Sequence, residues 1–388
     1  MTSGDYRLWT PQLEDPYPFY RRLRDDEPAH YSATEDLWVL SRFQDCLDAF
    51  TDWQTWSSER RGNLINDPPE RIGRTLGTTD PPRHTMARRL VNKAFTPRTV
   101  ARLEPVIRDH ARRLATGARD ASRIEFVHDV AGPLNAGILG ALFGMSETEV
   151  LEMRPALDDF FTRDAPEDGS TPRHVAAMAT LRGFLDTLTS ARTTRPGDDL
   201  ISAMIAAEEE GARLGHDEVV VTTMTFLTAG FESSNNLLTN MANALAVVDG
   251  LFDAVRVEPA SIGSFVEEAM RWDAAAQGFV RTPTRDVTLH ERQIPAGSQV
   301  LIHIGSANRD ERQFDQPDRF ALDRRSQRHL GLGHGTHFCV GAPLGRLLAR
   351  ICFEELLDVA TKWTPDYSTA TRVTTPNFRG FLRFGLEL

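Results

Sequence analysis

The segment His329–Arg346, HLGLGHGTHFCVGAPLGR, decides how this chain is interpreted. Glycines at 331, 333, 335, 341 and 345 surround the thiol of Cys339, and a helix-forming run follows at once. Glycine permits tight turns and the close approach of a flat ligand, and backbone N–H groups at a helix start stabilise a thiolate. The segment therefore predicts a loop that presents a sulfur ligand.

A thiol presented in this way has three interpretations. The first is a thiolate ligand to haem, which favours O–O cleavage and so predicts oxygen activation. The second is a zinc site with His334 and His337, although the spacing H-x-x-H-x-C offers only three ligands and no paired knuckles. The third is a small buried hydrophobe, the common role of a lone cysteine. The loop alone leaves all three open.

The composition predicts a single domain over residues 1–388. The chain is 40% hydrophobic, enough for a large core, and no linker or repeat divides it. A net charge of −11 argues against nucleic-acid binding. Three cysteines are too few for a disulfide framework and favour a reducing compartment. Without a secretion signal or an apolar span, we expect a cytoplasmic monomer.

Hydrophobic periodicity predicts a mainly α fold with a smaller β region. The segment 217–248 predicts an unusually long helix that is apolar nearly all round between Val219 and Ala229, so it must run through the core. The segment 57–79 lacks periodicity and predicts a long loop. Other predicted helices cover 18–24, 43–50, 81–117, 134–143, 147–163, 174–194, a stretch ending near 272, and about 343–363; predicted strands cover 37–42, 278–282, 286–289 and 299–303, with a hairpin ending at 388.

The long helix contains the sequence AGFESS, residues 229–234. Glycine costs a helix interior about 1 kcal/mol relative to alanine, and a buried glutamate is costly unless it is paired. One interpretation is a notch that admits oxygen and water, where Glu232 and Ser233 relay protons. The other is a tolerated kink with Glu232 in solvent.

Two further segments place charged residues on one helix face. In FVEEAMRW, Glu268 and Arg271 stand at i and i+3, where they can pair with each other and with Arg319 downstream, or form an ordinary surface pair. In DPPRHTMARR, His84 and Arg88 stand at i and i+4. They are either solvated or bind the carboxylates of a cofactor. In the second interpretation Arg281 and His337 join them, because haem carries two propionates.

Taken together, these segments resemble the cytochrome P-450 monooxygenases, the haem-thiolate family, and in particular its soluble bacterial members. The resemblance covers almost the whole chain. It rests on Gly-x-His-x-Cys-x-Gly at 335–341, on the E-x-x-R and acid–alcohol pairs, and on DPPRHTMARRLV and ANRDERQFDQPDRF, all in family order. It implies the cytochrome P450 fold, a helix-rich prism with a long central helix over the haem and a cysteine-ligand loop.

The resemblance also implies haem b, iron protoporphyrin IX, with O2 as co-substrate and Cys339 as the iron ligand. The implied cofactor-binding residues are His84, Arg88, Arg281, Gly333, His337 and Gly341. Ala229 and Gly230 would line the oxygen groove, and Glu232 and Ser233 would deliver protons. Glu268, Arg271 and Arg319 would form a structural triad. The implied substrate contacts are Leu64, Ile65, Phe226, Leu227, Gln277, Gly278, Phe279, Asn377 and Phe378.

Three positions depart from the family pattern. Leu332 replaces an aromatic residue at the head of the cysteine loop, and Ser233 replaces a threonine, which drops the methyl group that restricts its rotamer. The run Ala274–Ala276 replaces a proline after the E-x-x-R helix.

The implied activity is a monooxygenase reaction, the hydroxylation or epoxidation of a small organic substrate. The substrate would be a secondary metabolite or an aromatic or xenobiotic compound, free or tethered to a carrier protein. The loop arginines at 60, 61, 71 and 74 would meet an acidic substrate or lie in solvent. The alternatives are a hydrogen-peroxide-dependent peroxygenase and a non-catalytic haem-binding protein in a biosynthetic complex.

No flavin or nicotinamide fingerprint occurs in the sequence, so we expect a separate ferredoxin and ferredoxin reductase to supply electrons. The expected docking face is the cysteine side of the molecule, because basic residues near the loop suit an acidic ferredoxin. They are Arg83, Arg89, Arg324, Arg325, Arg328 and Arg346.

Overall fold

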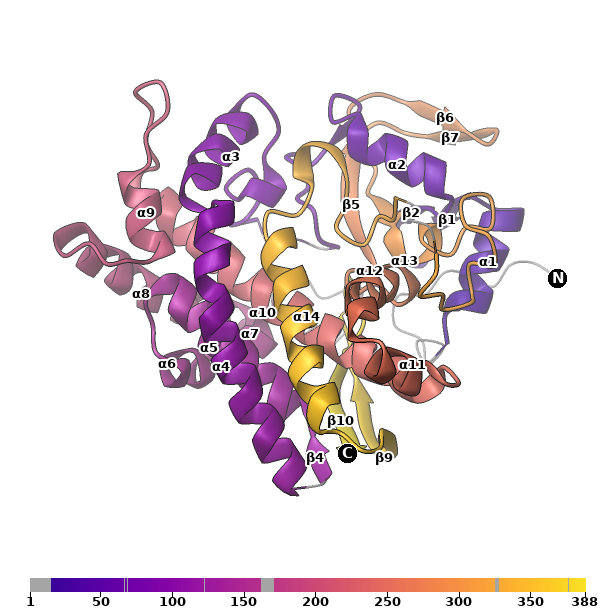
Figure 1. Cartoon of the computed structure of the whole chain (residues 1–388). Helices are drawn as coiled ribbons and strands as arrows, with labels where there is room; N and C mark the ends of the chain where they lie inside the picture. Colours follow the sequence, from indigo (N-terminus) through magenta and orange to yellow (C-terminus); the bar gives the residue numbers. More distant parts are fainter. Residues whose placement is uncertain are drawn as a thin grey trace.

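The computed structural model describes residues 15–65, 67, 69–121, 123–161, 171–324, 328–375 and 377–388. Helices dominate, which confirms the mainly α prediction (Figure 1). The helices are α1 (Tyr17–Asp26), α2 (Phe43–Thr51), α3 (Arg83–Ala94), α4 (Pro97–Ala121), α5 (Gly132–Phe143), α6 (Glu147–Glu152), α7 (Arg154–Phe161), α8 (Pro172–Thr194), α9 (Leu200–Ala206), α10 (His216–Val247), α11 (Leu251–Val257), α12 (Ile262–Trp272), α13 (Ile304–Ala307) and α14 (Ala342–Val359).

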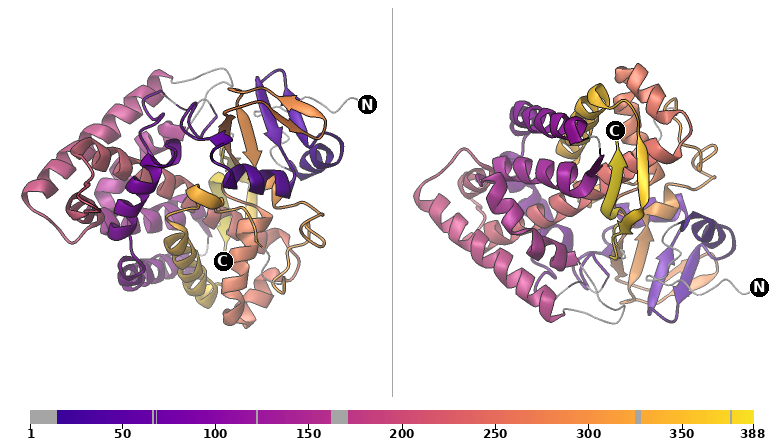
Figure 2. Two further views of the ribbon diagram at one scale, coloured as in Figure 1. Left: turned by 90° about the horizontal axis from the view of Figure 1, so that it is seen from above. Right: turned by 90° about the horizontal axis from the view of Figure 1, so that it is seen from below.

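The strands form three small sheets. Their bounds are β1 (Ala29–Ser32), β2 (Leu37–Leu40), β3 (Trp56–Ser57), β4 (Arg123–Glu125), β5 (Gly278–Pro283), β6 (Val287–Leu289), β7 (Arg292–Ile294), β8 (Val300–His303), β9 (Thr364–Arg372) and β10 (Phe381–Glu387). The largest sheet has the order β1-β2-β8-β5-β3, in which only the β2–β8 pair is parallel. The second has the order β4-β10-β9, and β6 pairs with β7. Seen from above and below, the largest sheet and α1 lie at the opposite end of the molecule from α8 (Figure 2).

The long helix α10 runs through the main hydrophobic core, as the sequence predicts. It packs against α5, α8 and α12, and it continues without a break through residues 229–234. Threonine hydroxyls along it donate to carbonyls one turn earlier, as Thr228 does to Met224 at 2.8 Å. These bonds satisfy polar groups that a core helix would otherwise bury without partners.

Several predicted boundaries need correction. The helix predicted over 81–117 is two helices, because Pro97 disfavours helical backbone at the residue before it, and Thr96 accepts from the Thr99 amide to begin α4. The helix predicted over 147–163 divides into α6 and α7 at Met153, ahead of Pro155. The sequence did not predict four of the strands, because they are short and show no clear alternation of apolar and polar residues. These strands are β1, β3, β4 and β7. Residues 162–170, which include the end of that predicted helix, lie outside the described residues.

Within the described ranges, no helix is both long enough and apolar enough to cross a bilayer.

Candidate active site

The cysteine loop is held between α2, α12 and α14. Gly335 has a φ of +66°, and a Cβ there would lie 2.5 Å from the carbonyl oxygen of Phe50 in α2. Only glycine fits such a position without strain. Gly333 also has a positive φ, of +68°. The Cys339 amide donates to the Leu332 carbonyl at 3.0 Å, which closes the loop just before α14 begins.

Cys339 stands at the start of α14, and as a residue it is exposed. Protein atoms packed around its thiol keep water from it and raise the pKa of the thiol, while the Gly341 amide, the Arg88 guanidinium and the Ala342 amide act in the opposite direction. These donors therefore favour a thiolate once a cation is bound, because metal binding requires the deprotonated ligand. The described residues hold no group of three or more His, Cys, Asp or Glu side chains placed for a metal ion. The described residues therefore provide no set of ligands for the zinc site considered above.

A cluster of basic side chains lies near the loop. His84 of α3 is buried, and neither of its ring nitrogens has a hydrogen-bond partner among the described residues. Its ring centroid lies 4.4 Å from that of His337, whose Nε2 is 3.2 Å from the Ser58 hydroxyl. Arg281 of β5 is only 4% exposed, and its one hydrogen bond to a described residue goes to the Val280 carbonyl. Arg88 donates to the Phe338 carbonyl at 2.8 Å.

Burial governs the charge states in this cluster. It lowers the pKa of Arg281 to about 10, and burial together with Arg88 lowers the pKa of His84 to about 4. Burial, Arg281 and His84 lower the pKa of His337 to about 2. Buried donors without acceptors cost folding free energy, so the cluster fits an anionic ligand with several acceptor oxygens. The two carboxylates of a haem have that chemistry.

The residues of AGFESS that the sequence singles out lie on α10. Ala229 is exposed and Gly230 and Ser233 are partly exposed, although most neighbouring residues of the helix are buried. Glu232 is buried, and Asn236 donates to its Oε1 at 2.9 Å. Burial raises the pKa of Glu232 to about 7. The interpretation of a solvent-facing Glu232 is therefore wrong, and this segment places a titratable acid beside a hydroxyl.

The E-x-x-R pair is buried and bidentate. Arg271 donates to the two carboxylate oxygens of Glu268 at 2.8 and 2.7 Å, and its other donors reach the carbonyls of Asn308, Pro317 and Arg319. The third member of the triad is Arg324, whose Nε lies 3.0 Å from Oε1 of Glu268. The prediction for Arg319 is wrong, because its side chain is 60% exposed and pairs with Asp323. Only its backbone carbonyl joins the network.

The structure divides the predicted substrate contacts into two groups. Phe226 and Phe279 are partly exposed, and Phe279 packs edge-to-face against Phe378 at 6.4 Å. Leu64 and Gly278 are buried, and Gly278 directly precedes Phe279 in the chain. Three of the other predicted contacts pack in a core or turn toward other elements. Leu227 is fully buried in the main core, and Ile65 packs in a smaller core with Tyr20 and Val280.

Gln277 is the third of these residues. It donates to the Ala274 carbonyl at 2.7 Å and accepts from the Tyr20 hydroxyl at 3.3 Å, so its amide faces α1 and α13. Two contacts that sequence reasoning missed also organise the long loop. Arg71 is buried and pairs with Asp67 at 3.0 Å, and it lies over the Phe160 ring of α7. The Asp67–Arg71 spacing of four residues was the available signal. Arg60, Arg61 and Arg74 are exposed.

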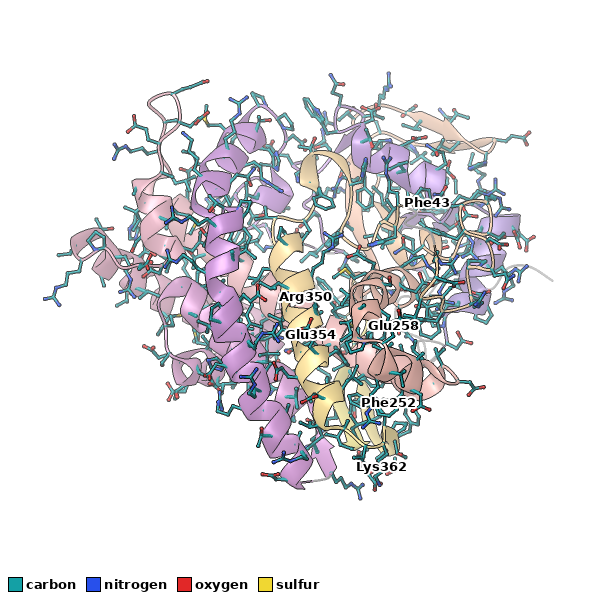
Figure 3. All side chains as sticks on the ribbon, in the orientation of Figure 1. Phe43, Phe252, Glu258, Arg350, Glu354 and Lys362 are labelled. Carbon is teal, nitrogen blue, oxygen red and sulfur yellow. The ribbon has the colours of Figure 1, made fainter. Side chains whose placement is uncertain are left out.

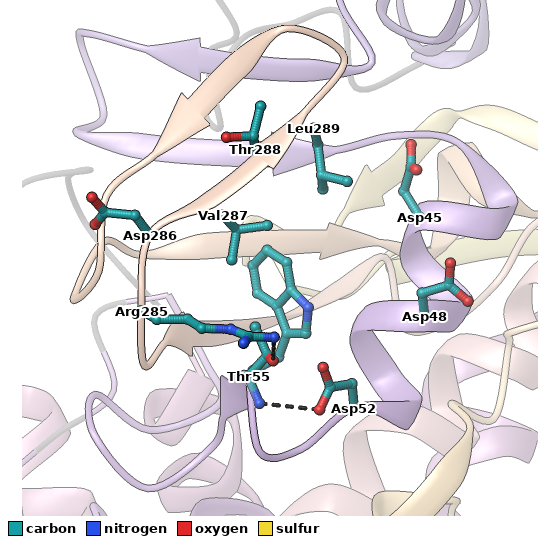
Figure 4. A pocket seen from close by; sticks show the side chains of 10 residues that line it. Asp45, Asp48, Asp52, Thr55, Arg285, Asp286, Val287, Thr288 and Leu289 are labelled. Carbon is teal, nitrogen blue, oxygen red and sulfur yellow. Dashed lines mark hydrogen bonds between the residues drawn. The ribbon is translucent and has the colours of Figure 1, made fainter.

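A separate groove of about 340 Å³ lies between α2 and the β6–β7 hairpin (Figure 4). Its acidic residues already accept hydrogen bonds within the chain, from His290 to Asp45 and from Gln44 to Asp48. Asp52 accepts from the Thr55 amide, and Asp286 from Gln293 and Ala296. The groove is therefore internally satisfied and lies apart from the cysteine loop and Glu232.

Comparisons with known proteins agree with this arrangement. A family model described as Cytochrome P450 matches residues 262–360, which include α12, the E-x-x-R pair and the cysteine loop. The cyclomarin C epoxidase CymV of Salinispora arenicola is 34% identical, with 87% of each chain covered. The cytochrome P450 monooxygenase PikC of Streptomyces venezuelae is 32% identical over 94% of this chain and 88% of its own.

A solved structure shares the fold over nearly the whole length. The crystal structure of CYP109E1 from Bacillus megaterium in complex with testosterone has a TM-score of 0.90 and 27% identity, and it covers 97% of this chain and 98% of its own. Three features of the site fit the cofactor chemistry of cytochromes P450, which is thiolate-ligated haem b with O2. They are the Cys339 thiol at the start of α14, the basic cluster with unused donors and the acid–alcohol pair on α10. This chain belongs to the cytochrome P450 family and is a haem-thiolate monooxygenase.

Proposed function

We propose that this chain hydroxylates or epoxidises a small, largely apolar organic substrate, with electrons from a separate ferredoxin and ferredoxin reductase. The observation that carries the proposal is the combination of the Cys339 thiol at the start of α14 with Glu232 and Ser233 on α10. The epoxidase name of CymV and the testosterone bound to CYP109E1 favour a bulky secondary metabolite or related compound. The aromatic side chains of Phe226, Phe279 and Phe378 suit such a substrate.

In this reaction, different residues of the chain would have different roles. When bound, haem b supplies the iron at which O2 is activated, and thiolate ligation by Cys339 favours O–O cleavage. His84, Arg88, Arg281 and His337 would hold its carboxylates. Glu232, with a pKa raised to about 7 by burial, is close to half protonated at neutral pH, so it can both release and regain a proton.

Ser233, the next residue of α10, would pass the proton on through its hydroxyl. Its missing methyl group leaves the rotamer less restricted than that of a threonine. We therefore expect Ser233→Thr to raise the amount of product formed per NADH consumed. Equal yields from both proteins would contradict this role for the residue.

We place the ferredoxin on the cysteine side of the molecule and the protein in the cytoplasm. Of the basic residues predicted for this face, Arg89 pairs with Glu210 and Arg346 with Glu267, and Arg324 is held by Glu268. Arg83 and Arg328 are exposed and form no ion pair with any described residue, so they are the free charges for docking. Arg325 lies outside the described residues.

The proposal is tested first by optical spectra of the purified ferric protein. We expect a thiolate-ligated haem spectrum that Cys339→Ala abolishes and Cys352→Ala retains, because Cys352 is buried within α14. A titration with natural-product scaffolds should shift the Soret band. Turnover of the shifting compound with a surrogate ferredoxin, reductase and NADH supports the monooxygenase reaction. Turnover with hydrogen peroxide alone would indicate a peroxygenase, and no turnover with either would indicate a binding protein.

A further inference from the structure

The buried side chain of Asn377 joins three segments that are far apart in the sequence. Its Nδ2 donates to the Gly278 carbonyl at the start of β5, at 2.9 Å. Its Oδ1 accepts from the Ile65 amide in the 57–79 loop, at 3.3 Å. Its own backbone carbonyl accepts from the Gln277 amide at 2.8 Å. Asn377 is 3% exposed, so these contacts are shielded from water.

The chemistry of this position requires an amide. One partner, Gly278, offers a carbonyl and needs a donor, whereas the other, Ile65, offers an N–H and needs an acceptor. Aspartate would keep the acceptor but place a carboxylate against the Gly278 carbonyl, and alanine would leave both backbone groups buried without partners. Few other side chains of this length satisfy both groups at once.

The three joined segments carry the side chains proposed to face substrate. Leu64 precedes Ile65, Phe279 follows Gly278, and Phe378 follows Asn377. Phe378 also forms a bridge with Ala276, and the Arg379 amide donates to Ala275 at 2.8 Å. The Val280 amide donates to the Asn63 carbonyl at 2.8 Å. The alanine run that replaces the family proline is thus fixed by the C-terminal turn, residues 377–380.

We propose that Asn377 is a positioning residue that locks residues 63–65, the start of β5 and the C-terminal turn into one unit, so that these parts of the pocket wall keep one geometry around the substrate. It acts through Leu64, Phe279 and Phe378 and does not itself contact the substrate. The role rests on the proposed function, because that function is what makes these side chains a pocket wall.

The contact is tested directly by hydrogen exchange of the haem-loaded protein. In Asn377→Ala the Ile65 amide loses its acceptor, so we expect peptides that contain Ile65 to exchange about tenfold faster. Asn377→Asp retains the acceptor and should keep most of the protection. The matched control is Asn243→Ala. Asn243 is also buried, and its Oδ1 accepts from the Tyr367 hydroxyl of β9, away from these segments.

The effect on the pocket is tested with two iron ligands of different size, imidazole and 4-phenylimidazole, by optical titration. We expect Asn377→Ala to raise the Kd of 4-phenylimidazole about tenfold and that of imidazole less than twofold, because only the phenyl group reaches the wall. Asn377→Asp should act in the same direction and replaces the alanine variant if that variant fails to fold. Asn243→Ala should change neither Kd.

Two results would overturn the proposal. The first is unchanged exchange at Ile65 in Asn377→Ala, and the second is an equal change in the Kd of both azoles, which indicates general damage to the haem site. A wild-type protein that lacks a thiolate-ligated haem spectrum would instead refute the proposed function, so the two failures are distinguishable.

Discussion

Glu232 shows how burial converts an ordinary side chain into a titratable group at neutral pH. Its pKa is raised by burial from an ordinary value of 4.5 to about 7, although Asn236 donates to it. The folded protein therefore holds this proton more tightly than the unfolded chain does. The contribution to stability is complete below about pH 4.5 and is lost as the pH rises through about 7.

Glu232→Gln should remove this pH dependence. Between pH 4.5 and 8, we expect the wild-type free energy of unfolding to fall by about 3 kcal/mol relative to the variant. Urea unfolding at both pH values measures the difference. Glu258→Gln is the control, because that residue is exposed (Figure 3). Parallel profiles for wild type and Glu232→Gln would show that the carboxylate is not buried.

The triad around Glu268 gives a second prediction for single residues. Arg324→Ala leaves a buried carboxylate with one cation fewer, so we expect it to lower the free energy of unfolding by about 3 kcal/mol. Arg319→Ala should lower it by less than about 0.5 kcal/mol, because its side chain is 60% exposed. Chemical denaturation of both variants measures this, and similar losses from the two would restore Arg319 to the triad.

Some of these residues could be predicted from the sequence, and others could not. Cys339, His84, Glu232 and the E-x-x-R pair stand within local motifs, so their neighbourhoods could be predicted. Arg324 and Arg319 are five residues apart in irregular chain, where no period indicates which side chain turns inward. The amide of Asn377 meets Ile65 across 312 positions, and no local pattern encodes such a contact.

At the scale of elements, α4 and α14 are joined by a network of ion pairs. Arg108 of α4 contacts Glu354 and Glu355 of α14, both at 2.9 Å, and Arg350 reaches back to Glu104 at 3.2 Å. Figure 3 shows Arg350 and Glu354 on α14. The helices themselves were predictable from periodicity, but their pairing was not, because charges on one helix do not identify their partners on another.

This network should contribute to stability in a salt-dependent way. We expect Arg108→Ala to lower the free energy of unfolding by about 1 to 2 kcal/mol at low ionic strength and by less in about 1 M NaCl. Arg98→Ala, an exposed position on α4 without an ion pair to any described residue, should have little effect in either condition. A loss for Arg108→Ala that salt does not reduce would point to packing of its aliphatic chain instead.

At the scale of the whole molecule, an acidic protein carries exposed basic residues beside its cysteine loop. With the proposed ferredoxin as partner, the net charge of −11 would repel an acidic protein, whereas the exposed Arg83 and Arg328 would attract it. The net charge and the positions of the arginines in the sequence together predicted this difference in sign. Which arginines remain unpaired depends on contacts with Glu210 and Glu267, and these required the structure.

Reversal of both free charges, Arg83→Glu with Arg328→Glu, should slow electron transfer from an acidic ferredoxin about tenfold at low salt, and less at about 0.3 M. Stopped-flow reduction measures the rate. Arg195→Glu, at the end of α8, is the control and should leave the rate unchanged. If the double reversal left both the rate and its salt dependence intact, the ferredoxin would dock elsewhere.

The continuous helix α10 has a consequence for how this protein could acquire new substrates. Its 32 residues make a rod of about 48 Å, tied to α8 through His216 and Asp186 and to β9 through Asn243 and Tyr367. A substitution at a buried position of such a rod disturbs the core that packs against it. Laboratory or natural evolution of selectivity should therefore accumulate changes in the 57–79 loop, the C-terminal turn and the partly exposed Phe226, while the buried residues of α10 stay nearly fixed.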